Sequence, residues 1–174
     1  NVIAQNRLKG VGFLSREDAI NYGVTGPSGR GSGWACDVRK RSPYAAYDKV
    51  QFDEVLYNEG DSYARYMVRM KEIEQSLHIL EQLVDNIPEG DYLAKTKPII
   101  KVPEGRYFKE VEAARGAFGI YLESRGDKFP YRLKVNSPGF NLVGAVDHMT
   151  RGSKIADLIA IGGSLDYVVP DIDR

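Results

Sequence analysis

The side chains best suited to chemistry in this sequence lie at its carboxyl end. Carboxylates and valines are interleaved there, at Asp166, Val168, Val169, Asp171 and Asp173. The chain then finishes on Arg174. Chain ends usually fray unless contacts hold them, so apolar residues this close to an end indicate an ordered tail. We expect the tail to face a working chamber, and the alternative is a tail that only caps the surface.

A second group of charged residues lies beside glycines, in loops and at the ends of segments. Its members are Arg30, Asp37, Arg39, Glu112, Arg115 and Asp166. Two interpretations fit such residues. The commoner one is a buried ion pair that fixes the geometry of a loop, and the other is an edge along which protons move.

The sequence lacks the residue patterns of a self-contained active site. Its one cysteine, Cys36, and its two histidines, His78 and His148, have no second His or Cys at metal-binding spacing. The glycine-rich stretch 23–33 suggests a phosphate cradle, but it lacks the Lys-Ser or Lys-Thr that follows the last glycine of a P-loop. We therefore expect no metal site, and a structural role for the glycines.

A long amphipathic helix is the main element available to position these residues. Apolar side chains recur every three or four positions, at Tyr63, Met67, Met70, Ile73, Leu77, Leu80 and Val84. This spacing places them in one stripe along a helix. Asp61 or Ser62 can cap its start, and the sequence from Pro88 to Gly90 is expected to end it.

Three other segments complete the first half of the chain. Residues 7–23 predict a short helix, with Ser15 as its cap and Gly23 as its stop. The aromatic-rich stretch 42–58 predicts irregular, packed structure, and the proline-containing stretch 91–105 predicts a connector.

The second half changes from strand to helix. Segments 107–112, 117–123 and 130–135 are rich in aromatic and β-branched residues and are separated by turn signals, which predicts a three-stranded antiparallel meander. After residue 138 the pattern is helical and is expected to stop at Gly162 and Gly163. The predicted fold class is α+β, with one long helix, a small antiparallel sheet, a carboxyl-terminal helix and an ordered tail.

Composition indicates one globular unit without a strong overall field. The chain has 174 residues, and its 24 basic and 24 acidic residues cancel. A nucleic-acid-binding module on the glycine and arginine loop is therefore disfavoured, as is global attraction to an anionic membrane. The longest apolar stretch, 158–169, is too short to cross a bilayer, and a single cysteine favours a reducing compartment.

Five motifs follow one another along the whole chain. They are Gly23-Val-Thr-Gly-Pro27 with Arg30-Gly-Ser-Gly33 and Asp37-Val-Arg39, Glu59-Gly-Asp-Ser62 with Arg65 and Arg69, Val111-Glu-Ala-Ala-Arg-Gly116, Lys128-Phe-Pro-Tyr-Arg-Leu-Lys134, and Gly163-Ser-Leu-Asp166 with Asp173-Arg174. Together they resemble the D subunit of NADH-quinone oxidoreductase, the respiratory complex I. The resemblance is to the carboxyl-terminal part of that subunit. Residues 1–174 are therefore expected to form a single unit of a larger polypeptide.

The resemblance implies a function that belongs to an assembly. Electrons from NADH would reach quinone and drive proton or sodium transfer, and the isolated fragment would be inactive. The tail, with Val168, Val169, Asp171, Asp173 and Arg174, would form part of the wall of the quinone chamber. No cofactor is expected on this chain itself, because quinone is the substrate and a 4Fe-4S cluster would lie in a neighbouring subunit.

The same resemblance implies partners and a location. The partners would be other complex I subunits, above all the iron-sulfur subunit that carries the last cluster and the membrane subunit where quinone enters. The location would be peripheral, on the cytoplasmic face of the cell membrane. No nucleic acid is expected as a partner.

The family is also distantly similar to the large subunit of nickel-iron hydrogenases. Aligned on Asp166, the two terminal metal-binding cysteines of those enzymes fall at Val168 and Asp171. Thiolates hold such a metal, so the alternative function is a hydrogenase-like protein that has lost its metal site.

Overall fold

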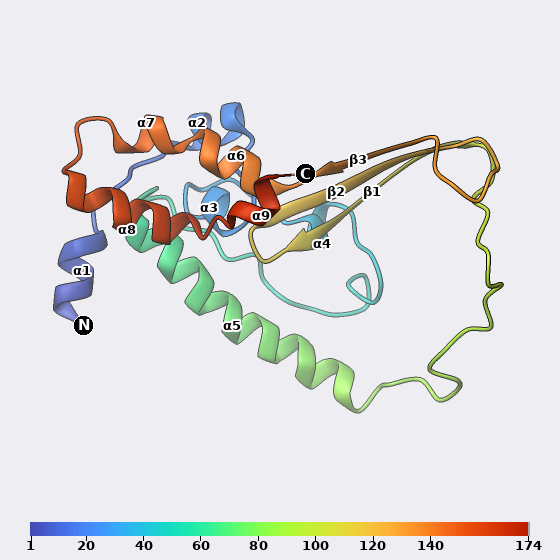
Figure 1. Cartoon of the computed structure of the whole chain (residues 1–174). Helices are drawn as coiled ribbons and strands as arrows, with labels where there is room; N and C mark the ends of the chain where they lie inside the picture. Colours follow the sequence, from blue (N-terminus) through green and yellow to red (C-terminus); the bar gives the residue numbers. More distant parts are fainter. Residues whose placement is uncertain (174) are drawn as a thin grey trace.

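The computed structural model describes residues 1–173, and Arg174 lies outside the described residues. Helices from the beginning and the end of the chain pack together at one side, and a long hairpin of strands extends away from them (Figure 1). The predicted α+β class, with one long helix and a small antiparallel sheet, is confirmed.

The first 41 residues form short helices joined by glycine-rich turns. These are α1 (Val2–Leu8), α2 (Arg16–Tyr22), α3 (Gly26–Arg30) and α4 (Val38–Arg41). Ser15 caps α2 through its Oγ, which accepts from the Asp18 backbone N–H at 3.0 Å, and Gly23 ends the helix at φ 68°. The prediction of one helix over 7–23 is wrong at its start, because Gly10 and Gly12 adopt positive φ and interrupt it.

The long helix α5 (Ser62–Val84) begins as expected, with Asp61 Oδ1 accepting from the Ala64 backbone N–H at 2.7 Å. It ends at Val84, earlier than Pro88, and residues 85–104 connect it to the sheet without regular structure. Most of the apolar stripe is exposed. The rest of the chain covers a different side of α5. The buried residues on that side are Ser62, Ala64, Arg65, Val68 and Ile79.

The three strands form the predicted meander. They are β1 (Gly105–Ala113), β2 (Gly116–Ser124) and β3 (Arg132–Asn136), in the order β1-β2-β3, and both pairings are antiparallel. Ala113 pairs with Gly116 at the tight turn between β1 and β2. This turn, with Arg115 in it, is the end of the sheet nearest the helices (Figure 1).

The carboxyl-terminal part is four helices instead of the one predicted. They are α6 (Pro138–Gly144), α7 (Val146–Thr150), α8 (Ile155–Leu165) and α9 (Val169–Ile172). Gly152, at φ 76°, lies in the break between α7 and α8. The expected stop at Gly162 and Gly163 is wrong, because α8 runs through both and ends at Leu165.

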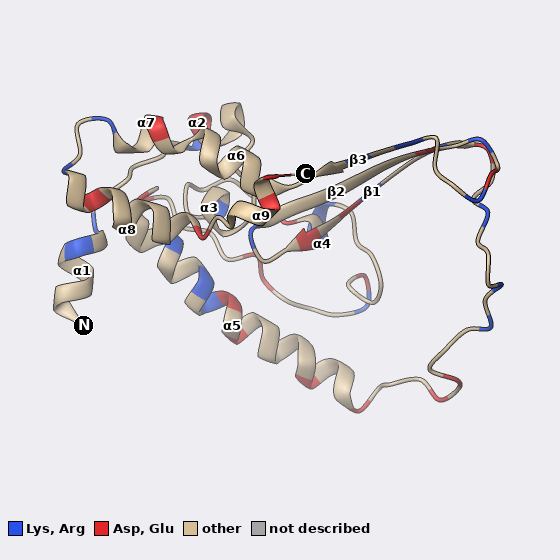
Figure 2. Cartoon of the chain, viewed as in Figure 1, with Lys and Arg blue, Asp and Glu red and all other residues tan. Residues whose placement is uncertain are grey.

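The main core lies where α2, α6 and α8 meet. Its fully buried members include Leu14, Val24, Leu142, Ile161 and Leu165. Charged residues of both signs are distributed over the chain, and the second half of α5 carries few of them (Figure 2). Among the described residues, the search for a helix long and apolar enough to cross a membrane finds none.

Candidate functional site

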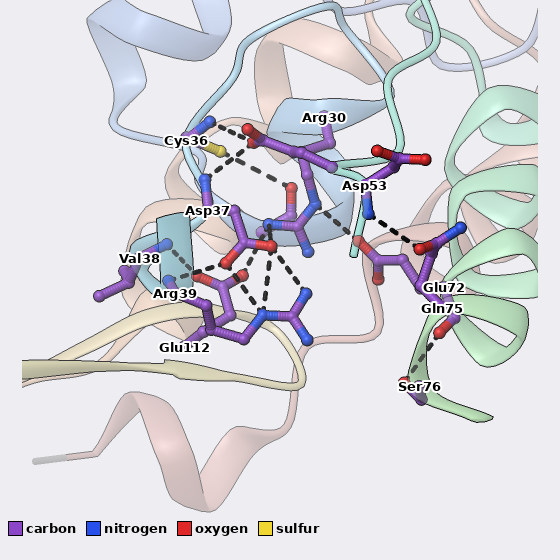
Figure 3. A network of polar contacts seen from close by, with 12 residues as sticks. Arg30, Cys36, Asp37, Val38, Arg39, Asp53, Glu72, Gln75, Ser76 and Glu112 are labelled. Carbon is purple, nitrogen blue, oxygen red and sulfur yellow. Dashed lines mark hydrogen bonds and ion pairs between the residues drawn. The ribbon is translucent and has the colours of Figure 1, made fainter. Parts of the chain in front are cut away.

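Arg30 is the centre of a buried ion cluster. The residue is 1% exposed and is the last residue of α3. Its Nε donates to Glu72 Oε1 on α5 at 2.7 Å, and its Nη1 donates to Glu112 Oε1 on β1 at 2.7 Å. Figure 3 shows both contacts. One guanidinium therefore joins α3, the long helix and the sheet.

Asp37 extends this cluster to α4. It accepts from Arg39 Nη2 at 2.7 Å and lies 3.9 Å from Arg30 Nη1 (Figure 3). It also caps α4, because its Oδ1 accepts from the Arg39 backbone N–H at 2.9 Å. Glu112 Oε2 accepts from the Val38 backbone N–H at 3.0 Å. Every carboxylate in the cluster thus has partners from its own or another element.

Burial and pairing act on the charges of this cluster in opposite directions. Burial alone would lower the pKa of Arg30, but Glu72 and Glu112 raise it above its ordinary value. Burial would raise the pKa of Asp37, yet hydrogen bonds and charge from Arg39 and Arg30 lower it. For Glu112, burial outweighs Arg30 and the pKa is raised. The cluster is held in its charged form mainly by its arginines.

Two glycines allow the loop that carries Arg30 to lie against the sheet. A Cβ on Gly26 would lie 2.5 Å from Gly116 Cα, and a Cβ on Gly116 would lie 2.4 Å from Thr25 Oγ1. Both residues also have positive φ, so side chains are disfavoured on both counts. Thr25 Oγ1 accepts from the Ala117 backbone N–H at 2.9 Å and fixes the contact.

Arg115 and Asp166 form a second, separate pair. Arg115 Nε donates to the Asp166 carbonyl oxygen at 2.5 Å, and its Nη2 lies 3.6 Å from Asp166 Oδ2. Asp166 ends α8 in the left-handed region at φ 56°. The turn between β1 and β2 is thereby fixed to the residue from which the tail departs.

Two further arginines lie on α5, although the sequence reasoning did not name them as site residues. Arg65 is fully buried and donates to Ser164 Oγ, to Ser62 Oγ and to the carbonyl oxygens of Gly12 and Gly60. Burial lowers its pKa to about 9, which leaves it protonated at neutral pH. The available signal was an arginine four residues before another, near the start of α5.

Arg69 lies one turn further along α5. Its Nη1 donates to the Arg65 carbonyl oxygen at 3.1 Å. Burial lowers its pKa, against the opposing charges of Asp166 and Glu72. It also lines a cavity of about 530 Å³ between α5 and α8, which we call the α5–α8 cavity.

The predicted tail is ordered on α6. Asp171 Oδ2 accepts from Ser137 Oγ at 2.5 Å, and the same hydroxyl accepts from the Gly139 backbone N–H at 3.1 Å. Val168 is half-buried, whereas Val169 is 68% exposed and Asp173 is exposed. Asp171 therefore anchors the tail, while Val169 presents its side chain outward.

The predicted site residues thus fall into three places. Arg30, Asp37, Arg39 and Glu112 meet in one cluster, Arg115 meets Asp166, and the tail residues lie on α6. Ion pairs occur in the first two groups: the Arg30 cluster is buried, whereas the pair of Arg115 and Asp166 is partly exposed. The chamber role of Val168, Val169, Asp171 and Asp173 stays a prediction, and Arg174 lies outside the described residues.

The described residues offer positioning and charge more than bond-making chemistry. Cys36 is buried, and burial raises the pKa of its thiol to about 12, so it is not a nucleophile at neutral pH. Within residues 1–173, no three His, Cys, Asp or Glu side chains are grouped as metal ligands would be.

Comparison with known proteins gives matches along the whole chain. A family model described as respiratory-chain NADH dehydrogenase, 49 Kd subunit, matches residues 1–101 and 96–174. The C/D subunit of NADH-quinone oxidoreductase from Bacteroides fragilis is 70% identical over 174 residues, and the protein of that name from Phocaeicola vulgatus is 68% identical. The D subunit of NADH-quinone oxidoreductase from Desulfotalea psychrophila is 54% identical over 175 aligned positions.

These relatives are longer than the chain. All of the chain is covered in each comparison, but only 33% of the Bacteroides fragilis protein, 34% of the Phocaeicola vulgatus protein and 47% of the Desulfotalea psychrophila protein. The chain thus spans about a third to a half of the length of the relatives it matches. On the extent of the family match, this chain belongs to the family of the 49 kDa subunit, also called the D subunit, of respiratory-chain NADH dehydrogenase.

Proposed function

We propose that this chain is part of the quinone-reducing module of NADH-quinone oxidoreductase, and that its tail forms part of the wall of the quinone chamber. Family membership supports the assembly, because the similar proteins are named as subunits of that enzyme. The observation that carries the local assignment is the tail itself: it is anchored through Asp171 while Val169 stays 68% exposed.

An anchored tail with an outward valine suits a chamber wall. An apolar side chain that the rest of its own chain leaves uncovered, on a backbone held by hydrogen bonds, presents a fixed surface to whatever lies beside it. Asp173 adds an exposed carboxylate on the same tail. Reduction of a quinone creates negative charge, and nearby carboxylates coupled to arginines can supply protons or change protonation state.

The remaining parts of the reaction would come from other subunits. Quinone would be the substrate, and electrons from NADH would arrive through a 4Fe-4S cluster in a neighbouring iron-sulfur subunit. A membrane subunit would adjoin the chamber where quinone enters. The complex would drive proton or sodium transfer in its membrane arm, and this chain would lie peripherally on the cytoplasmic face. This chain would contribute binding surface and charge to that assembly.

A hydrogenase function finds no support in these residues. Val168 and Asp171 occupy the positions of the two terminal cysteines in the hydrogenase resemblance, and Asp171 is already bound to Ser137. Neither side chain supplies a thiolate, so the residues present do not fit a nickel-iron group.

Cysteine labelling in the assembled enzyme tests the chamber assignment. Val169→Cys should react with a maleimide, and saturating quinone or a quinone-site inhibitor should slow the labelling of that peptide, as followed by mass spectrometry. Ile155→Cys is the matched control, because Ile155 is 92% exposed at the far end of α8. Equal labelling of Cys at position 169 with and without quinone would contradict the assignment.

A further inference from the structure

The face of the sheet that contacts α4 is covered only at the end nearest the helices. On β1, Glu110 pairs with Arg41 of α4, and Glu112 accepts from a backbone N–H of the same helix. Side chains two residues apart on a strand point to the same face, so Phe108 and Arg106 continue this face beyond α4. Phe108 is 61% exposed. The outer part of the face is therefore open in the described chain.

Strand register completes two rows of side chains on this open part. The inner row runs from Phe108 on β1 across Tyr121 on β2 to Lys134 on β3. Directly paired side chains of antiparallel strands lie on one face, about 5 Å apart. Together with the next row outward they form what we call the outer sheet face, whose members are Arg106, Phe108, Tyr121, Glu123, Arg132 and Lys134.

The basic side chains of the outer sheet face are available to a partner. Arg106, Arg132 and Lys134 are all exposed. Within residues 1–173, the ion pairs that the three strands make are those of Glu110 and Glu112, at the other end of the sheet. The three cations thus have no ion-pair partner in the described part of the chain.

The segments around the outer sheet face add to its positive charge. Residues 95–109 and 121–134 contain nine basic and three acidic residues, although the whole chain has 24 of each. Ser124 Oγ donates to the Val102 carbonyl oxygen at 2.7 Å and holds the connector against the strands. This end of the sheet is therefore positive in a neutral chain (Figure 2), and a local field of this sign attracts anionic groups.

Phe108 places an apolar ring among these charges. A Cβ on Gly119 would lie 3.1 Å from Phe108 Cε2, so the ring lies over a strand position where a side chain would crowd it. Lysine and arginine on edge strands also protect a sheet from pairing with another sheet. That protection explains the charges, but it does not require an exposed phenylalanine between them.

We propose that the outer sheet face is a docking surface for an acidic segment of another polypeptide in the assembled enzyme. Phe108 would make the apolar contact, and Arg132 and Lys134 would bind the carboxylates. Aromatic and arginine side chains are enriched in protein interfaces, and guanidinium groups bind carboxylates through charge-assisted hydrogen bonds.

The arrangement of the face favours a protein over an anionic membrane. Glu123 lies between Arg106 and Arg132, where it would be repelled by lipid of the same charge, whereas a folded partner can leave room for it or pair with it. The sheet also extends away from the helices (Figure 1), which places this face within reach of a neighbour. The inference rests on the proposed assembly, and it is independent of the chamber assignment.

Photocrosslinking in the assembled enzyme tests the surface. The photoreactive residue p-benzoylphenylalanine in place of Phe108 should crosslink to another subunit, at a peptide rich in Asp and Glu that mass spectrometry identifies. Lys134→Glu in the same protein should lower the yield of that crosslink about tenfold, because like charges would then face each other. Lys109→Glu is the matched control, because Lys109 is equally a lysine of the sheet, is exposed, and lies on the opposite face.

A second reversal protects the test against a simple folding defect. Replacing the partner's crosslinked acidic residues with lysine should restore the yield in the Lys134→Glu enzyme. A crosslink to lipid, to the chain's own polypeptide or to a peptide without carboxylates would overturn the proposal. So would the absence of a crosslink, equal yields in Lys134→Glu and Lys109→Glu, or no restoration.

The outcome is separable from that of the chamber test. Labelling of Val169→Cys is read from a different peptide and responds to quinone. Loss of the predicted crosslink with intact protection of position 169 by quinone would reject the docking surface alone. The predicted crosslink without that protection would reject the chamber alone.

Discussion

At the scale of residues, Arg30 holds the most carboxylates together. The residue is 1% exposed, and its guanidinium contacts Glu72 and Glu112 directly, with Asp37 at 3.9 Å. Removing one partner of a buried ion pair is costly because it leaves the others uncompensated. The stability of the junction between α3, α5 and β1 should therefore depend strongly on this one side chain.

Arg30→Leu should lower the free energy of unfolding by about 3–5 kcal/mol. Arg151→Leu removes an arginine from an exposed pair with Asp147 and should change the free energy of unfolding far less. Urea unfolding of the two variants and the unchanged chain measures both effects. Similar unfolding midpoints for the two variants would show that the cluster contributes no more than a surface pair.

The cluster also predicts how stability changes with pH. The pKa of Asp37 is lowered from its ordinary value of 3.8 because the hydrogen bonds and charges of Arg39 and Arg30 outweigh burial. A carboxyl group with a lowered pKa in the folded state contributes stability above its ordinary pKa, and this stability is lost as the pH falls through the folded value. Asp37 should thus favour folding at neutral pH and not in strong acid.

Asp37→Asn isolates this contribution, because asparagine resembles the protonated aspartate. The difference in free energy of unfolding between the unchanged chain and Asp37→Asn should be largest above pH 3.8 and should shrink as the pH is lowered further. Urea unfolding at a series of pH values gives this difference. A difference that stays constant, or grows toward acid, would contradict the sign of the shift.

Sequence reasoning identified four residues of this cluster, but it missed Glu72 and did not predict which residues pair. Arg30, Asp37, Arg39 and Glu112 stand out as charges beside glycines, whereas Glu72 reads as one more polar residue of a helix. Pairing between residues this far apart in sequence depends on how α3, α5 and β1 pack, which local patterns do not encode. Arg65 and Arg69 were missed for the same reason.

At the scale of elements, individual capping residues were predictable, and the full bounds of the helices were less so. Ser15 and Asp61 cap α2 and α5 as expected, because capping needs only a side chain and a backbone N–H three residues away. In α8, Gly162 and Gly163 were expected to stop the helix. The helix instead continues to Leu165, because packing of Leu165 in the core and binding of Ser164 to Arg65 outweigh the poor helix propensity of glycine.

The apolar stripe of α5 was located from its spacing, and most of it is exposed in the structure. Tyr63, Met70, Leu77 and Val84 are seven residues apart, and Tyr66, Ile73 and Leu80 lie between them at spacings of three and four. This is the heptad pattern of a helix that packs against another helix. Periodicity shows which residues share a face, but not whether the described chain covers that face.

The isolated chain should self-associate through this stripe, because an exposed apolar seam of this length favours pairing with a second copy. Leu77 and Leu80 are 56% and 60% exposed, so Leu77→Lys with Leu80→Lys should lower the average mass in light scattering without lowering helix content. His78→Lys, between them on another face, is the control. A chain that is monomeric at high concentration before any substitution would contradict this expectation.

At the scale of the whole molecule, hydrogen bonds near both ends of the described tail join it to the rest of the chain. Arg115 holds Asp166 at its beginning, and Ser137 holds Asp171 near its end. Sequence reasoning predicted an ordered tail from its apolar residues, and α9 is ordered. Its hydrogen bond to α6 could not be predicted, because Ser137 and Asp171 come together only after α6 to α8 have folded back on the sheet.

The chamber assignment is tested most directly by enlarging Val169 in the assembled enzyme. Val169→Phe adds volume to an outward side chain on an anchored backbone, and overfilling a packed wall costs about 1–3 kcal/mol. A loss of about 1.4 kcal/mol is tenfold in affinity. Reduction of quinone and sensitivity to quinone-site inhibitors should therefore change, whereas electron transfer from NADH to an artificial acceptor that bypasses the chamber should stay near normal.

The comparison needs assembled complex and one control. Assembly is checked first, since a folding defect would lower both activities. Ile155→Phe is the control, because it enlarges another exposed apolar residue, at the opposite end of α8 from the tail. The account predicts altered quinone kinetics in Val169→Phe and native kinetics in Ile155→Phe, with the bypass activity preserved in both. An assembled Val169→Phe enzyme with native quinone kinetics and native inhibitor sensitivity would show that the tail only caps the surface.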